Sequence, residues 1–182
     1  MRADVVPLGV DPPEDVNVVV TVAAGAAPLR VDVTADGLLE VVQLHHTAMR
    51  VPGTLGILPR TRVGSASPLV ALVLGEHAIG HGLIVGVRPV GVLYVSSEGV
   101  PSERSDEVTL LAVPTRRLST RHDAIASYTD LPTGELRRIA NFFERYRDVE
   151  EGGRQRTSGW GDVSEAHRVV MEAAARARRP VT

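Results

Sequence analysis

The strongest constraint on the fold is a series of short segments that are rich in β-branched residues and separated by glycine, proline or aspartate. Their ranges are 16–22, 29–33, 38–44, 69–74, 82–88, 90–95 and 108–113. Runs of this length with such punctuation predict β-strands. A succession of short strands joined by turns is typical of a sheet that closes into a barrel.

Two helical patterns follow the strands. Residues 133–150 place Leu136, Ile139 and Phe143 on one face at spacings of three and four, which predicts an amphipathic helix. Asp162, with Glu165 three positions later, predicts a capping box at the start of a helix over 163–178. Strands first and helices last indicate an α+β fold: a small closed β-barrel flanked by two C-terminal helices.

Length and composition narrow the class of protein. With 182 residues and a mass of 19.4 kDa, the chain is expected to form a single domain over residues 1–182. A formal net charge of −2 gives no reason to expect nucleic acid or a membrane surface as partner. Because the sequence shows no leader pattern and no apolar run of about 18 residues, a soluble cytoplasmic protein is expected.

A set of short motifs stands in a fixed order along the chain. They are Pro13-Glu14-Asp15, Thr47-Ala48-Met49, Arg88-Pro89-Val90-Gly91-Val92-Leu93, Leu111-Ala112-Val113-Pro114, Asp130-Leu131-Pro132, the stretch that opens with Phe142-Phe143-Glu144, and Gly159-Trp160. Their order and spacing resemble the soluble, family I inorganic pyrophosphatases, from about residue 13 to about residue 178. The resemblance implies an OB-like barrel and an enzyme that splits pyrophosphate with the help of divalent metal ions.

The metal-binding signature of that family is altered here. The family pattern reads Asp-x-Asp-Pro-x-Asp, whereas this chain keeps Pro68 but has Ser65, Ser67 and Val70 at the three acidic positions. A hydroxyl is a weak ligand for a hard cation and an isopropyl group is none. The sequence therefore predicts a divergent member that lacks most metal-binding aspartates, with no resident metal and with magnesium binding at most weakly.

The resemblance also places the remaining site residues. The other metal carboxylates would fall at Thr21, Asp32, about Ser97, and Glu107. The phosphate-binding cations would fall at Arg30, Gln43, Thr109 and Arg147. The site tyrosines would fall at Tyr146, Val51 and Leu55. The segment 96–106 is longer than the family pattern, which leaves open whether Glu98, Glu103 or Asp106 replaces a lost ligand.

These replacements suggest two interpretations of the old site. Val51, Leu55 and Val70 make part of it apolar, and its polar groups are mostly uncharged, a mixture that suits a small organic ligand. The alternative is a retired site that has filled with packing residues. His45 is expected on the same face of its strand as Gln43, toward the site, where a histidine can act as an acid or base.

The expected function follows from the weakened metal site. The first hypothesis is a repurposed fold that binds or transforms a small organic molecule by metal-free acid–base chemistry, as an isomerase, cyclase or lyase does. The alternatives are a non-catalytic pseudoenzyme that acts through association, and a weak magnesium-dependent inorganic diphosphatase. Bacterial members of the family imply a homo-oligomer, with a hexamer as the default.

These hypotheses give two sets of candidate site residues. The catalytic candidates are His45, Asp32, Glu107 and Tyr146. The ligand-binding candidates are Arg30, Gln43, Val51, Leu55, Ser65, Ser67, Val70, Thr109 and Arg147. Arg30 and Asp32, two positions apart on one strand, are expected to form an ion pair or an anion clamp.

Overall fold

The structure is a computed structural model that describes residues 2–64, 67–75, 77–97, 107–146 and 155–178. Its strands are β1 (Val16–Val22), β2 (Leu29–Val33), β3 (Leu39–Leu44), β4 (Thr54–Ile57), β5 (Val70–Val73), β6 (Ile84–Ser97), β7 (Glu107–Pro114) and β8 (Gln155–Gly161). Its helices are η1 (Ala3–Val5), η2 (Tyr128–Asp130), α2 (Thr133–Arg145) and α3 (Val163–Ala177). None of the helices in these ranges combines the length and the apolar character that crossing a bilayer requires.

The main sheet closes on itself. Its strand order is β1-β4-β5-β7-β6-β8, and a further pairing of β1 with β6 completes the ring. The pairs are antiparallel except for β5 with β7, which run parallel. This arrangement confirms the prediction of an α+β fold built on a small closed, OB-like barrel with two helices near the C-terminal end of the chain.

Both faces of the barrel strands are buried, and each face packs against a different helix. Leu110 and Ala112 of β7 belong to a cluster with Ala166 and Val170 of α3. Leu111 and Val113 of the same strand belong to a second cluster, which includes Ile139 and Phe142 of α2. Because successive side chains of a strand point to opposite faces, the continuous apolar run in β7 contributes side chains to both clusters.

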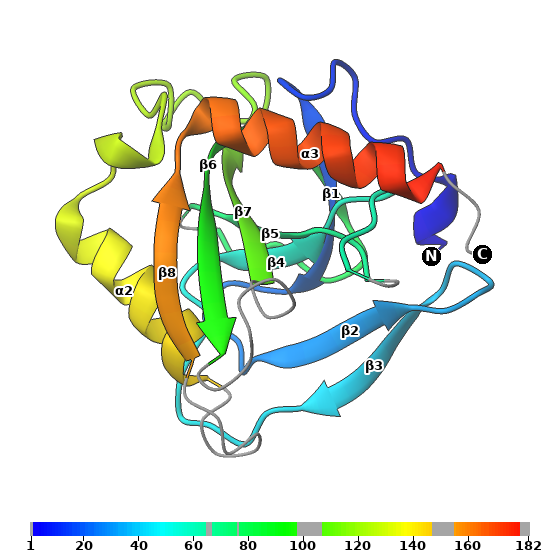
Figure 1. Cartoon of the computed structure of the whole chain (residues 1–182), viewed down its shortest axis with the longest axis horizontal. Helices are drawn as coiled ribbons and strands as arrows, with labels where there is room; N and C mark the ends of the chain where they lie inside the picture. Colours follow the sequence, from blue (N-terminus) through cyan, green and yellow to red (C-terminus); the bar gives the residue numbers. More distant parts are fainter. Residues whose placement is uncertain (1, 65–66, 76, 98–106, 147–154, 179–182) are drawn as a thin grey trace.

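Strand β2 and strand β3 form a separate hairpin on the side of the barrel away from α3 (Figure 1). The pair is antiparallel, with Arg30 opposite Gln43 and Asp32 opposite Glu40, and its register shifts between Arg30 and Val31. Several of its apolar side chains are exposed, among them Val41, Val42 and Leu44. Leu29, Val33 and Leu39 of the hairpin pack against the buried clusters, whereas these exposed side chains do not.

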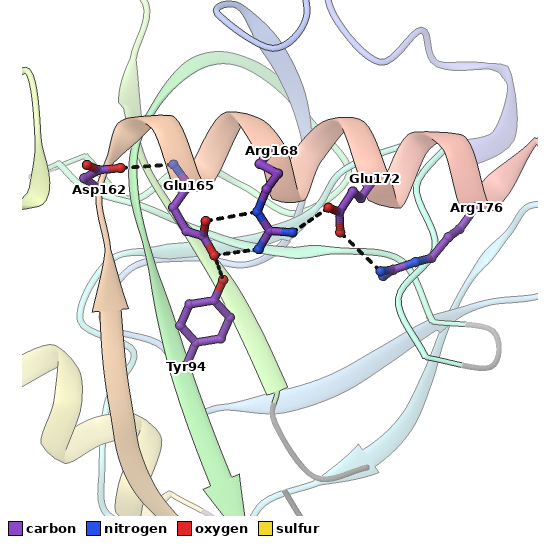
Figure 2. A network of polar contacts seen from close by, with 6 residues as sticks. All are labelled: Tyr94, Asp162, Glu165, Arg168, Glu172 and Arg176. Carbon is purple, nitrogen blue, oxygen red and sulfur yellow. Dashed lines mark hydrogen bonds and ion pairs between the residues drawn. The ribbon is translucent and has the colours of Figure 1, made fainter. Parts of the chain in front are cut away.

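Helix α3 is held to the barrel by a network of polar contacts (Figure 2). The Tyr94 hydroxyl on β6 donates a hydrogen bond of 2.5 Å to the carboxylate of Glu165. The same carboxylate accepts hydrogen bonds from Arg168, whose guanidinium also contacts Glu172. These bonds, first that from Arg168 and then that from Tyr94, lower the pKa of Glu165 to about 2.

One of the two hydrogen bonds of the predicted capping box is present at the start of α3. The Asp162 side chain accepts a hydrogen bond from the Glu165 backbone N–H at 3.0 Å, as an N-cap aspartate does. The Glu165 side chain, instead of returning to the N-cap, binds Arg168 and Tyr94. Arg168, one turn further along the helix, and the Tyr94 hydroxyl on β6 together stabilise this orientation of the Glu165 side chain.

Several element boundaries differ from the prediction. The segments 82–88 and 90–95 are one strand, β6, with a bulge between Pro89 and Gly91. The strands β4 and β8 were missed. The first is buried along its whole length and so lacks alternation, and the second is polar and is held by pairing with β6. Helix α2 ends at Arg145, and the expected helical residues 147–150 lie outside the described ranges.

Candidate functional site

A pocket of about 490 Å³ opens between the hairpin, the barrel and the last turn of α2. Its walls come from segments far apart in the sequence: β2, β4, β5, β7 and the C-terminal end of α2. A pocket of this size, largely apolar with a few convergent polar groups, is the usual form of a small-ligand site. It is therefore the candidate functional site.

The charged groups of the described pocket are one guanidinium and two carboxylates. Arg30 and Asp32 lie on β2, and Glu107 begins β7. The Arg30 Nη2 and the Asp32 Oδ2 are 3.7 Å apart, so the predicted ion pair is present. Both side chains are more than a third exposed. An exposed pair at this distance contributes only about 0–1 kcal/mol, and Arg30 can therefore turn toward an anion at little cost.

Hydroxyl groups supply most of the remaining polarity. Thr21, Ser67 and Thr109 line the pocket. Thr109 is buried and is the register partner of Val70 across the parallel β5–β7 pair, so these two side chains lie next to each other. The Thr21 hydroxyl donates a hydrogen bond to the carbonyl of Leu55 at 3.3 Å.

An aromatic cluster closes the end of the pocket beside α2. The ring of Tyr146 stacks on Phe142, with centroids 4.9 Å apart, and meets Phe143 edge to face. His45, which is buried just after β3, meets Tyr146 edge to face with centroids 5.1 Å apart. The pocket is therefore lined on this side by rings that α2 positions through its apolar stripe.

Most of the predicted site residues that the structure describes converge on this pocket. They are Arg30, Asp32, His45, Leu55, Ser67, Val70, Glu107, Thr109 and Tyr146. Gln43 faces Arg30 across the hairpin and is not part of the pocket lining. Val51 is buried and lines a different hollow, between the loop after β3 and the start of α2. Ser65 and Arg147, like Glu98, Glu103 and Asp106, lie outside the described residues.

Sequence reasoning missed part of the apolar wall. Ile57, Val63, Val108 and Phe143 also line the pocket. Phe143 belongs to the predicted helical stripe, and Val108 begins a predicted strand. Ile57 lies on the strand that was missed, so only the tertiary structure brings it to the site.

Comparison with known proteins identifies the family. The model of the family "Inorganic pyrophosphatase" matches residues 18–178. The inorganic pyrophosphatase of Bradyrhizobium diazoefficiens is 36% identical over 180 residues, which are 98% of each chain. That of Agrobacterium fabrum is 36% identical over 174 residues, 95% of this chain and 96% of the other. The structure of the inorganic pyrophosphatase from Thermus thermophilus superposes with a TM-score of 0.85, covering 98% of this chain and all of the other at 27% identity.

Three findings define one class of protein: the topology of the barrel, the position of the pocket, and the match over nearly the whole chain. The chain belongs to the inorganic pyrophosphatase family.

This result overturns the expected function. Relatives about 35% identical over nearly their full length are named inorganic pyrophosphatase, which supports pyrophosphate hydrolysis and not a repurposed fold with metal-free chemistry on a small organic molecule. The pseudoenzyme interpretation is wrong on the same ground. The expected function rested on replaced ligands at single positions of the site, whereas the similarity to these named enzymes extends over nearly the whole chain.

The expectation that no cofactor takes part is also wrong for a member of this family, because family I pyrophosphatases depend on magnesium. Asp32 and Glu107 are the carboxylates of the pocket, and in the described ranges no three or more Asp, Glu, His or Cys side chains gather as a metal site. Holding several divalent ions close together needs more carboxylates than this. The described donor set does not fit a resident cluster of metal ions.

Proposed function

We propose that this chain is a divergent inorganic pyrophosphatase that hydrolyses pyrophosphate in the pocket beside Arg30 and Thr109. The observation that carries the proposal is the similarity to named inorganic pyrophosphatases over nearly the full length of both chains. Its divergence lies in the site, where Ser65, Ser67 and Val70 stand at positions that the family pattern gives to aspartate.

The described residues supply binding groups for a diphosphate. In hydrolysis, the oxygen of a water forms a bond to one phosphorus, the bridging P–O bond breaks, and two phosphates leave. The Arg30 guanidinium is suited to bind a phosphoryl group through two parallel hydrogen bonds. The Ser67 and Thr109 hydroxyls can donate to further phosphoryl oxygens, and the carboxylates of Asp32 and Glu107 can accept a proton or hydrogen bond from the attacking water.

The test is release of phosphate from pyrophosphate by the full chain with magnesium present. We expect turnover within the ordinary range for enzymes, about 1–10³ per second. The double variant Asp32→Asn, Glu107→Gln should lose at least about 10²-fold in kcat/KM, since it removes both carboxylates of the described pocket. The matched control is Asp36→Asn, an exposed change in the turn of the same hairpin. If the wild-type protein releases no more phosphate than buffer at any magnesium concentration, the proposed function is wrong.

The proposal includes the state of the protein in the cell. We propose a single domain over residues 1–182 that works in the cytoplasm as a homo-oligomer, with a hexamer as the expected size. The support for association is the hairpin, on which Val41, Val42 and Leu44 are between 47% and 61% exposed. Neighbouring exposed apolar side chains of this kind often mark a protein–protein contact.

A further inference from the structure

One wall of the pocket is a loop that leaves β4 and returns to β5. Its described parts are residues 58–64 and 67–69. Four residues of the loop line the pocket: Val63, Gly64, Ser67 and Pro68. A binding group on a loop is placed only as accurately as the surrounding structure holds that loop. The contacts of the loop therefore decide where the Ser67 hydroxyl lies.

The buried side chain of Thr61 closes the base of the loop. Its hydroxyl donates to the Leu58 carbonyl at 2.7 Å and accepts from the Leu69 backbone N–H at 2.9 Å. The Leu58 N–H in turn donates to the Leu69 carbonyl at 2.8 Å. These three bonds connect the two arms of the loop where they join β4 and β5.

Arg62 fastens the outer part of the loop to the C-terminal end of α3. Its backbone N–H donates to the Ala173 carbonyl at 2.9 Å, and its Nη2 donates to the Arg176 carbonyl at 2.6 Å. The Arg176 carbonyl is one of the last four of the helix, which have no partner one turn further on. A guanidinium is favoured there, because it satisfies such a carbonyl and faces the negative end of the helix dipole.

The path from this contact to the pocket is short. Arg62 precedes Val63, whose N–H donates to the Ser67 carbonyl at 2.8 Å across the loop. Arg60 has a φ of 56° and Gly64 a φ of 58°, so the backbone on both sides of Arg62 and Val63 passes through the left-handed region. A residue other than glycine keeps that conformation where its surroundings impose it. The shape of this loop is therefore sensitive to its contact with α3.

We propose that Arg62 is a positioning residue of the pocket: by fastening the loop to α3, it fixes the Ser67 hydroxyl where a phosphoryl oxygen binds. This inference rests on the proposed function, in which Ser67 donates to the substrate. Arg62 is not among the residues that line the pocket, and it acts through the bridge between Val63 and Ser67.

The first test measures the loop itself and needs no substrate. Arg62→Met keeps much of the length of the side chain and removes its guanidinium. We expect residue-resolved hydrogen exchange at the Val63 amide to become at least about tenfold faster, because the loop opens locally more often. The Leu69 amide, which bonds to Thr61, should keep its rate and is the control within the same chain. Arg60→Met removes an exposed guanidinium from the same loop and should change neither rate.

The second test asks whether the loop acts on substrate binding through Ser67. We expect Arg62→Met to raise KM for pyrophosphate about 3–10-fold with kcat within about twofold, since a misplaced binding group weakens substrate and transition state alike. Arg62→Lys should restore most of the loss, because a single carbonyl needs only one donor. Ser67→Ala should have a much smaller effect in the Arg62→Met background than in the wild-type chain, because coupled residues are not additive. Arg60→Met should leave both constants unchanged.

Two results would overturn the inference. Equal exchange at Val63 in the wild-type chain and in Arg62→Met would show that Arg62 does not hold the loop, and additive effects of Arg62→Met and Ser67→Ala would exclude the route through Ser67. If Arg62→Met does not fold, Arg62→Gln replaces it in both tests. A chain that releases no phosphate refutes the proposed function and with it the role of Ser67, whereas the exchange measurement still decides whether Arg62 holds the loop.

Discussion

Arg30 is the described residue on which recognition of an anion depends most. It is the guanidinium of the pocket lining, and its partner Asp32 is too exposed and too distant to hold it firmly. The chain has no lysine, so every cation that it offers to phosphate is an arginine or a histidine. A planar guanidinium can bind two phosphoryl oxygens at once, which a compact ammonium cannot.

We expect Arg30→Gln to lower kcat/KM for pyrophosphate by about 10–100-fold, because a hydrogen bond to a charged group contributes about 1.5–3 kcal/mol. The melting temperature should change little, since the ion pair is exposed. Steady-state assays of phosphate release would measure the first effect and calorimetry the second. Arg137→Gln, an exposed change on α2, is the matched control. Equal activity of the two variants would show that Arg30 does not contact the substrate.

Helix α3 shows how one element is held by both apolar packing and charge. Ala166, Val170 and Ala173 are buried in the barrel core, while the opposite face carries Glu165 and Arg168. Only Tyr94 connects this polar row to the barrel among the contacts drawn in Figure 2. Burial beside Glu165 raises the pKa of the Tyr94 hydroxyl to about 12, so it remains a donor at any pH of interest.

The network predicts a dependence of stability on pH. Because Arg168 and Tyr94 lower the pKa of Glu165 from 4.5 to about 2, the carboxylate stabilises the fold above about pH 4.5. This contribution should decline as the pH falls toward 2, where the carboxylate is protonated in both states. We expect Glu165→Gln to lower the melting temperature at pH 7 and to lose that difference near pH 2. Glu40→Gln, an exposed change on β3, serves as control. A constant difference from pH 7 to pH 2 would contradict the assignment.

At the scale of the whole molecule, the hairpin is the part that the barrel leaves uncovered. Among the strands that the structure describes, β2 and β3 pair with each other alone, and Val42 and Leu44 lie on one face of β3 with about half or more of their surface exposed. An isolated two-stranded hairpin is only marginally stable in water. A second copy of the chain against this face would bury its apolar side chains and would also steady Arg30 and Asp32 on β2.

We therefore expect light scattering at micromolar concentration to give a mass several times 19.4 kDa. Leu44→Arg should lower that mass, because it places a charge in the proposed contact. Val10→Arg is the matched control, since Val10 is 77% exposed and lies outside the two strands of the hairpin. A wild-type mass of a single chain would refute the proposed association, and an unchanged mass for Leu44→Arg would place the contact elsewhere.

The sequence by itself determined the elements whose pattern is local. β-Branched content between turn residues located β1, β2 and β7, the apolar stripe located α2, and Asp162 located the start of α3. The pairing of Arg30 with Asp32 could also be predicted, because two residues apart on a strand share a face. In each case the interaction acts between neighbours in the chain.

The tertiary structure decided what depends on distant segments. Closure of the barrel requires β1 to pair with β6 and β5 with β7, and the order of residues alone does not specify these partners. Strand β4 is buried along its whole length, so its sequence shows no alternation that would predict a strand. The polar segment of β8 takes strand conformation because it pairs with β6. The same long-range packing placed Val51 outside the pocket and Ile57 within it, because membership of a site depends on how the walls meet in space.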